Sequence, residues 1–389
     1  MDAKFGLTAE QREFRASVRS WVDFHFPKGK ALQLEKREQT YPVELFEAIG
    51  QAGYYGVGID ETYGGSGGSV LDQTVLIREL ARNLGGLAWI WGINAFAGAK
   101  SIGLYGTEDQ KNRFLPDLAA GKLKFAIAVT EPDGGTDVLG AMTSTGRRVP
   151  GGWRLDARKT WSTQSSVADY VLLLARTGPP EPKPYSGLTL FLVPGGAAGF
   201  SAVPIPKLGM RCLPSCEVFC DDVFVPDELV LGEPGQAWRQ LTRTLNVERI
   251  ILASLALGIL DGVLEEATDY VKQRRAFGRP IGQFQILQHY LADIVIDQRA
   301  TELLVWRAAA LASDGLPCEV DANVAKVFAA ERAVHAADVG IQIMGGLGYS
   351  ADTHMQRYWR DARLYPLAPI SNEMARNSIA EDLGLPRSF

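Results

Sequence analysis

A carboxylate interrupts an apolar helical stripe in the second half of this sequence. Apolar residues recur there at intervals of three and four with one gap: Trp238, Leu241, Leu245, Leu252, Leu255 and Ile259. The residue that would complete the stripe is Glu248, and Arg249 follows it. Burial in a low dielectric raises the pKa of a carboxyl toward the range useful to a general base, and Arg249 can hold the anion. From the pattern alone, a structural Glu–Arg pair at a helix bend is the more common outcome.

The elements that must position Glu248 fall into three regions. Helical periodicity runs from residue 1 to about 124, beginning with Thr8 as an N-cap. Residues 125–235 alternate and are rich in β-branched residues, with glycine and proline between the runs. From 236 to 389 the period is helical again. We therefore predict an N-terminal α-helical domain (1–124), a middle β-barrel-like domain (125–235) and a C-terminal four-helix bundle (236–389).

Composition excludes several classes of protein. A chain of 389 residues with a net charge of −5 is a poor match for nucleic acid or for an anionic membrane surface. No apolar run approaches the roughly 20 residues that span a bilayer. The N-terminal stretch is a capped amphipathic helix without the apolar core of a signal peptide. We expect a cytoplasmic protein with no membrane insertion and no nucleic acid partner.

Two features that resemble binding motifs are weak. Cys212, Cys216 and Cys220 would share one face of a strand, but no CxxC pair or nearby histidine accompanies them, so reduced, packed thiols are expected and no metal site. The glycine-rich stretch 63–68 follows no strand and lacks the Lys-Ser/Thr of a nucleotide loop. It is expected to form a turn.

Seven ordered segments resemble those of the acyl-CoA dehydrogenase family, over essentially the whole chain. They are AVTEPDGGTD (128–137), RKTWST (158–163), KLGMR (207–211), DDVFVP (221–226), RRAFGRPIGQFQ (274–285), QIMGGLGYS (342–350) and RYWRDARL (357–364). The resemblance implies an oxidoreductase with non-covalently bound FAD. Its substrate would be an acyl thioester of CoA or of a carrier protein. An electron-transfer flavoprotein or another acceptor would reoxidise the reduced FAD.

The resemblance also implies which residues contact FAD. From the same chain these are Ile127, Val129, Thr130, Gly135, Thr136, Trp161 and Thr163, with Trp161 against the flavin ring. From a neighbouring subunit they are Arg274, Phe277, Gln285, Gln342 and Gly346. A shared site of this kind implies a homo-oligomer, usually a tetramer in this family. Without the flanking motifs, Arg274 and Arg275 would be interpreted as a solvated helix end.

The chain departs from the family at the usual catalytic base, a glutamate in a loop after the RDAR segment. Alignment without a gap places Pro369 at that glutamate and Ile370 at the following glycine. Proline cannot accept a proton and has no N–H to donate to a substrate oxygen. Ser371 and Glu373 align with residues on the cofactor side and are assigned to FAD.

A minority of the family, including isovaleryl-CoA dehydrogenase, carries the base on the long helix in the sequence Leu-Asp-Leu-Glu-Arg. The segment LNVERIILA matches that pattern with Glu248 in the glutamate position. Crotonobetainyl-CoA reductase is similar, since it also has Glu-Arg on the helix and no glutamate in the loop. We therefore expect α,β-dehydrogenation of an acyl thioester, with Glu248 and Arg249 as the catalytic pair. The alternatives are an enoyl-thioester reductase, a flavin monooxygenase or oxidase, an inactive partner subunit, and an acyl-CoA-binding module.

Overall fold

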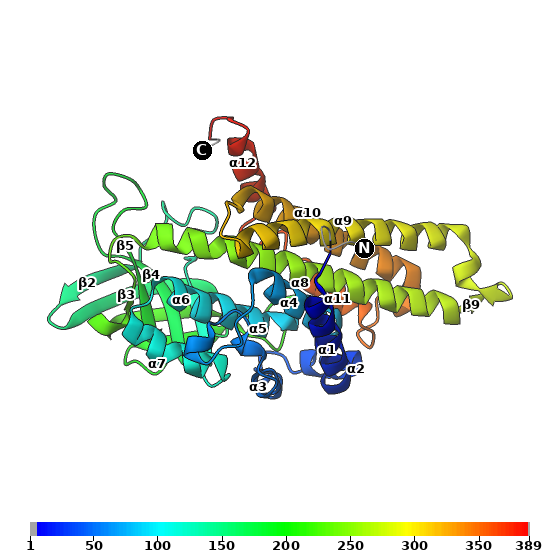
Figure 1. Cartoon of the computed structure of the whole chain (residues 1–389), viewed down its shortest axis with the longest axis horizontal. Coiled ribbons are helices and arrows are strands. Elements are labelled where there is room, and N and C mark those ends of the chain that lie inside the picture. The colour runs from blue at the N-terminus through cyan, green and yellow to red at the C-terminus, as the bar shows by residue number, and fades with distance from the viewer. Residues whose placement is uncertain (1–5, 388–389) are drawn as a thin grey trace.

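The computed structural model describes residues 6–387, and it confirms the predicted order of a helical part, a sheet and a second helical part (Figure 1). The N-terminal helices are α1 (Ala9–His25), α2 (Lys28–Glu35), α3 (Val43–Gln51), α4 (Val70–Leu84), α5 (Trp89–Ile93), α6 (Ser101–Tyr105) and α7 (Glu108–Ala119). Thr8 is the N-cap of α1, as predicted, and forms a reciprocal capping box with Gln11. The glycine-rich stretch 63–68 forms the turn before α4.

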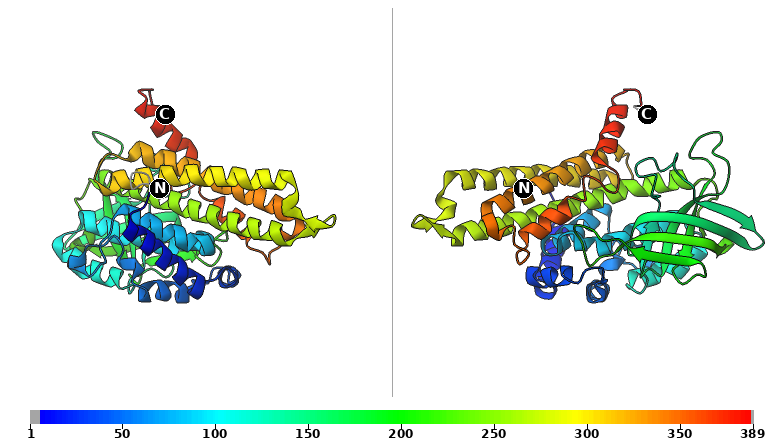
Figure 2. Two further views of the ribbon diagram at one scale, coloured as in Figure 1. Left: turned by 45° about the vertical axis from the view of Figure 1, so that its right-hand side comes forward. Right: turned by 180° about the vertical axis from the view of Figure 1, so that it is seen from behind.

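The central sheet contains β1 (Phe125–Ala128), β2 (Thr145–Val149), β3 (Gly152–Thr163), β4 (Tyr170–Arg176), β5 (Leu188–Pro194), β6 (Phe200–Pro204), β7 (Ser215–Pro226) and β8 (Val230–Leu231). The strand order is β6-β7-β3-β2-β4-β5-β8, with β1 parallel to β4. Strands β4 and β5 are buried almost throughout, which explains their nearly continuous runs of Val and Leu. Figure 2 shows the sheet from behind, at one end of the molecule.

The cysteines need one correction. Cys216 and Cys220 lie on β7, but Cys212 precedes the strand, so the three do not share one strand face. All three are buried free thiols, and burial raises the pKa of each of them.

The C-terminal part is organised around α8 (Ala237–Gln273), a helix of 37 residues. It is followed by β9 (Arg275–Ala276), β10 (Arg279–Pro280), α9 (Gln285–Ser313), α10 (Glu319–Met344), α11 (Met355–Ala362) and α12 (Asn372–Asp382). Helix α8 runs from the sheet to the β9 hairpin at the opposite end of the molecule (Figure 1). It packs against α10, α4 and α9, and residues 247–263 are all buried. No helix within residues 6–387 is both long enough and apolar enough to cross a membrane.

Candidate active site

Glu248 lies in the buried middle of α8, as the apolar stripe predicts. Only 5% of the residue is exposed. Burial raises the pKa of its carboxyl to about 8, although Arg249 and Lys326 act in the opposite direction. Within residues 6–387 its Oε2 has no hydrogen-bond partner. A buried, unpartnered carboxyl with a pKa near neutrality is suited to accept a proton from a bound molecule.

Arg249 does not hold Glu248 in the direct ion pair that the sequence suggested. Its Nη1 donates to Oδ1 of Asn246 across 2.9 Å. Among residues 6–387 it forms no ion pair with an N–O distance of 4.0 Å or less. Burial lowers the pKa of Arg249, while Glu319 and Glu248 raise it. The guanidinium therefore acts on Glu248 through space, because its side chain turns toward its own helix.

The loop with Pro369 lies close to the same part of α8. The carbonyl of Ile370 accepts a hydrogen bond of 2.5 Å from Nζ of Lys326, the residue on α10 that also acts electrostatically on Glu248. Ser371 is the N-cap of α12, and its Oγ accepts from the amide of Met374 across 3.2 Å. The helix position and the loop position thus both border Lys326.

The predicted flavin residues of the sheet come together along β3. The amide of Thr160 donates to the carbonyl of Thr130 across 2.9 Å, and Oγ of Ser162 donates to the carbonyl of Ile127 across 2.5 Å. These bonds hold Ile127 on β1, and Val129 and Thr130 just after it, beside the end of β3, which carries Trp161 and Thr163.

Two residues that the sequence assigns to FAD are exposed and have a left-handed backbone conformation. Trp161 is 60% exposed, which is unusual for an indole on a strand, and its φ is 59°. Gly135 has a φ of 50°, and a Cβ at this position would meet no atom within 4 Å. Thr136 follows it in the same exposed turn. An exposed indole can stack against a flat ring and an open turn can receive a phosphate, so the residues present fit FAD.

Glu131 fixes that turn, a role that the sequence did not reveal. Its carboxylate accepts from Nζ of Lys159 (2.9 Å), the amide of Ser144 (3.0 Å) and the amide of Thr143 (2.7 Å). Burial alone would raise the pKa of Glu131, but these bonds lower it to about 2. The permanently ionised carboxylate therefore closes the loop of residues 131–144, which contains Gly135.

The second group of predicted FAD residues lies at the other end of the molecule. Arg274, Phe277 and Gln285 surround the β9 hairpin, which Figure 1 shows far from the sheet. The hydroxyl of Tyr270 donates to the carbonyl of Met344 across 3.4 Å and so joins this end of α8 to the segment with Gln342 and Gly346. Phe277 is 94% exposed. One copy of the chain therefore does not bring the two groups together.

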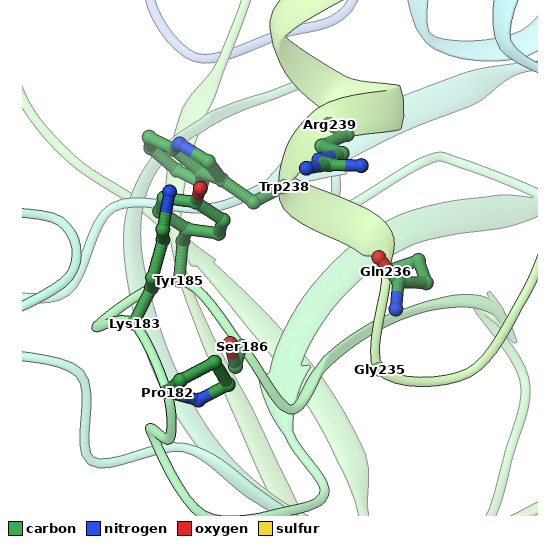
Figure 3. Close-up of a pocket in the computed structure, with 8 residues that line it drawn as sticks. All are labelled: Pro182, Lys183, Tyr185, Ser186, Gly235, Gln236, Trp238 and Arg239. Atoms are coloured by element: carbon green, nitrogen blue, oxygen red, sulfur yellow. The ribbon is translucent and has the colours of Figure 1, made fainter.

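A pocket of about 240 Å³ lies where α8 begins. Figure 3 shows Trp238 beside Tyr185 and Lys183, where the helix meets the loop between β4 and β5. A larger groove of about 750 Å³ lies between α7 and the sheet. Neither is lined by Glu248 or by a predicted FAD residue. Trp238 precedes Glu248 by ten residues on α8, roughly 15 Å along the axis at 1.5 Å per residue.

Comparison with known proteins identifies the family. Three family models match the chain: acyl-CoA dehydrogenase, N-terminal domain (residues 8–122), middle domain (126–223) and C-terminal domain (235–384). An acyl-CoA dehydrogenase of Bacillus subtilis is 33% identical over 97% of this chain and 98% of its own length. The mitochondrial isovaleryl-CoA dehydrogenase of Solanum tuberosum is 33% identical over 96% of this chain and 90% of its own.

Solved structures agree in fold over almost the whole chain. Butyryl-CoA dehydrogenase from Megasphaera elsdenii has a TM-score of 0.93 and 31% identity over 99% of this chain and all of its own. The FAD complex of PigA has a TM-score of 0.91 and 26% identity over 99% of this chain and all of its own. Since the family models cover nearly the whole sequence, the chain is an oxidoreductase that belongs to the acyl-CoA dehydrogenase family.

Proposed function

We propose that this protein catalyses FAD-dependent α,β-dehydrogenation of an acyl thioester, with Glu248 as the base. One observation carries the proposal. The residue at the usual base position is Pro369, whereas the buried carboxyl of Glu248 has a pKa raised to about 8 and no hydrogen-bond partner for Oε2 within residues 6–387. The 33% identity to an isovaleryl-CoA dehydrogenase supports the same choice. A retained base also favours dehydrogenation over flavin monooxygenase chemistry.

In this proposal Glu248 removes the α-proton of the substrate. Bound FAD would supply the acceptor for the hydride that leaves Cβ. The α-proton of a thioester is far too weakly acidic for an exposed carboxylate, so the site must also stabilise the thioester oxygen. Pro369 has no N–H for this purpose. The amide of Ile370 is the nearest donor along the loop, and Lys326 holds its carbonyl in place. Arg249 stabilises the ionised base through space.

The cofactor site is completed by a second copy of the chain. Trp161, Thr163 and the turn with Gly135 would hold the flavin and the pyrophosphate. Ser371 and Glu373 would contact the cofactor from the loop side. Arg274, Phe277, Gln285, Gln342 and Gly346 would reach the FAD of a neighbour, since they lie exposed at the far end. Ile286, Ile296 and Leu303 leave an uncovered apolar face on α9, which supports a homo-oligomer, a tetramer in our proposal.

We retain domain boundaries at 124/125 and 235/236, a cytoplasmic location, and an electron-transfer flavoprotein or another acceptor as the oxidant. The pocket at the start of α8 contains Lys183 and Arg239 beside two aromatic rings. Cationic and aromatic side chains bind phosphate and flat rings, so this pocket suits the phosphorylated end of a CoA or carrier-protein thioester.

Anaerobic bleaching of the flavin tests the proposal. The purified protein is mixed with a panel of acyl-CoAs and acyl-carrier proteins, and the visible flavin band is followed. Bleaching by at least one saturated acyl thioester, with release of its enoyl product after reoxidation, is the expected result. Reduction only by an unrelated donor, followed by oxidation by an enoyl thioester, would instead establish a reductase. A protein that carries no flavin would exclude both activities.

A further inference from the structure

Lys326 is a lysine with no exposed surface in the interior of the helical bundle. Its Nζ donates to the carbonyl of Ile370 across 2.5 Å and to Oδ1 of Asn372 across 2.8 Å. Asn372 in turn donates to Oε1 of Glu331 across 3.2 Å. Burying an ammonium destabilises the folded state unless hydrogen bonds and opposite charge compensate for its lost hydration. A lysine with no role beyond stability would therefore be expected at the surface. Lys326 joins α10 to the loop that carries Pro369.

Lys326 belongs to a polar stripe on α10 that faces the candidate base. Glu319, Asn323 and Lys326 stand at positions i, i+4 and i+7 and so share one face of the helix. Glu319 acts electrostatically on Arg249, and Lys326 acts on Glu248. Since α10 packs against α8, these interactions place the stripe near residues 248 and 249.

Several polar atoms in this region lack a partner. Asn323 is fully buried, and within residues 6–387 neither its Nδ2 nor its Oδ1 has a hydrogen-bond partner. The same holds for Oε2 of Glu248 and Nε of Arg249. Buried polar atoms without partners are rare in folded proteins. These atoms lie on two helices that pack against each other, which indicates a polar region around Glu248 and not an ordinary apolar contact.

We infer that Lys326 is a positioning residue for the base. Its positive charge favours the ionised form of Glu248, and its hydrogen bonds hold the 369–372 loop beside α10. This inference rests on the proposed role of Glu248. The charged groups that face the pair come from three helices. They are Arg249 on α8, Glu319 and Glu331 on α10, and Glu373 and Arg376 on α12.

The direction of the effect follows from the charges. Burial lowers the pKa of Lys326 to about 8. Of the charged groups that oppose this change, Glu373 has the largest effect. Lys326 is therefore positively charged in the neutral range and loses its charge as the pH rises above about 8. Burial raises the pKa of Glu248, and the charge on Lys326 reduces that rise. A neutral side chain at 326 must raise the pKa of Glu248 further.

The test compares Lys326→Gln, which keeps a donor for Ile370 but loses the charge, with Lys326→Arg, which keeps the charge. The rate of flavin reduction by the acyl-CoA that bleaches the wild type fastest is measured against pH. The wild-type rate should rise with a midpoint near pH 8. In Lys326→Gln we expect this midpoint about one pH unit higher, as for the loss of a nearby opposite charge. In Lys326→Arg it should stay within a few tenths of a unit.

Lys207→Gln is a matched control. Burial also lowers the pKa of Lys207 to about 8, and its Nζ donates to the carbonyl of Met210 across 2.6 Å. Lys207 is not among the groups that act on Glu248, so its replacement should leave the midpoint in place. Should Lys326→Gln not fold, Glu331→Gln serves instead. It removes a negative charge that supports the protonated form of Lys326 and should move the midpoint upward by a smaller amount.

A second measurement needs no turnover. The infrared band of protonated carboxyl groups is titrated in the resting enzyme, and the component that is absent from Glu248→Gln reports Glu248 directly. Its midpoint should rise in Lys326→Gln by the same amount as the kinetic midpoint. If the reduction rate of Glu248→Gln still rises with pH as in the wild type, Glu248 is not the base. If this rise is absent from Glu248→Gln but its midpoint does not move in Lys326→Gln, only the inference about Lys326 is overturned.

Discussion

The amide of Thr160 donates to the carbonyl of Thr130 across 2.9 Å and so joins the end of β3 to the segment that follows β1. This bond places Trp161, the next residue on β3, close to the segment that contains Thr130. The residues of the sheet that we assign to the flavin are held by this bond, by Oγ of Ser162 and by the carboxylate of Glu131, so they should remain in place when a single assigned side chain is changed.

We expect Trp161→Ala to shift the visible absorption band and the reduction potential of the bound flavin without unfolding the protein, because an indole that is 60% exposed contributes little to the core. Visible spectroscopy and potentiometry measure the effect. Trp153→Ala is the control, since Trp153 lies on the same strand but contacts Phe191 and Arg148. An unchanged spectrum and potential in Trp161→Ala would mean that this indole does not contact the flavin.

Arg274→Ala should weaken retention of FAD by ~1.5–3 kcal/mol, the range for loss of a charge-assisted hydrogen bond to phosphate. FAD release on dilution, followed by flavin fluorescence, measures the loss. The neighbouring Arg275→Ala is the control, because Arg275 donates to the carbonyl of Gly278 across 2.8 Å within its own turn. Light scattering of the same samples should show an oligomer, and a monomer with full FAD content would contradict the shared site.

The burial of the candidate base was predictable from local sequence patterns. The burial of Glu248 followed from the apolar residues on both sides of it, since helical periodicity alone decides which face of a helix is covered. The partner of Arg249 did not follow, because Asn246 competes for the guanidinium at short range within the helix. Lys326 had no sequence signal beyond its place among alanines on α10, since its burial depends on a loop more than 40 residues further along the chain.

Asp261→Ala should lower the free energy of unfolding by about 3 kcal/mol, because it leaves the guanidinium of Arg78 buried with one partner fewer. Nε of Arg78 lies 2.6 Å from Oδ2 of Asp261, and both side chains are 4% exposed. Asp227→Ala removes an exposed pair with Arg148 and should lower the free energy of unfolding far less. Thermal unfolding of the two variants measures the difference. Equal midpoints would show that the buried pair stabilises the fold no more than the exposed pair does.

The raised pKa of Glu248 also predicts how stability depends on pH. Since the folded state favours the protonated carboxyl, its contribution is complete below the usual carboxyl pKa and is lost as the pH rises toward about 8. Wild type should therefore lose thermal stability relative to Glu248→Gln between pH 5 and pH 9. Melting temperatures of both proteins across this range measure the effect. Parallel curves would mean that the carboxyl does not titrate in this interval.

The central claim is that Glu248 is the base, and stopped-flow reduction of the flavin in Glu248→Gln tests it most directly. The amide keeps the shape of the side chain but cannot accept a proton. With an acyl thioester that reduces the wild type, binding should persist while reduction slows by at least ~10²-fold, the lower range for loss of a general base. Glu266→Gln, on the same helix and paired with Lys28, should reduce at the wild-type rate. Reduction of Glu248→Gln at the wild-type rate would contradict the account.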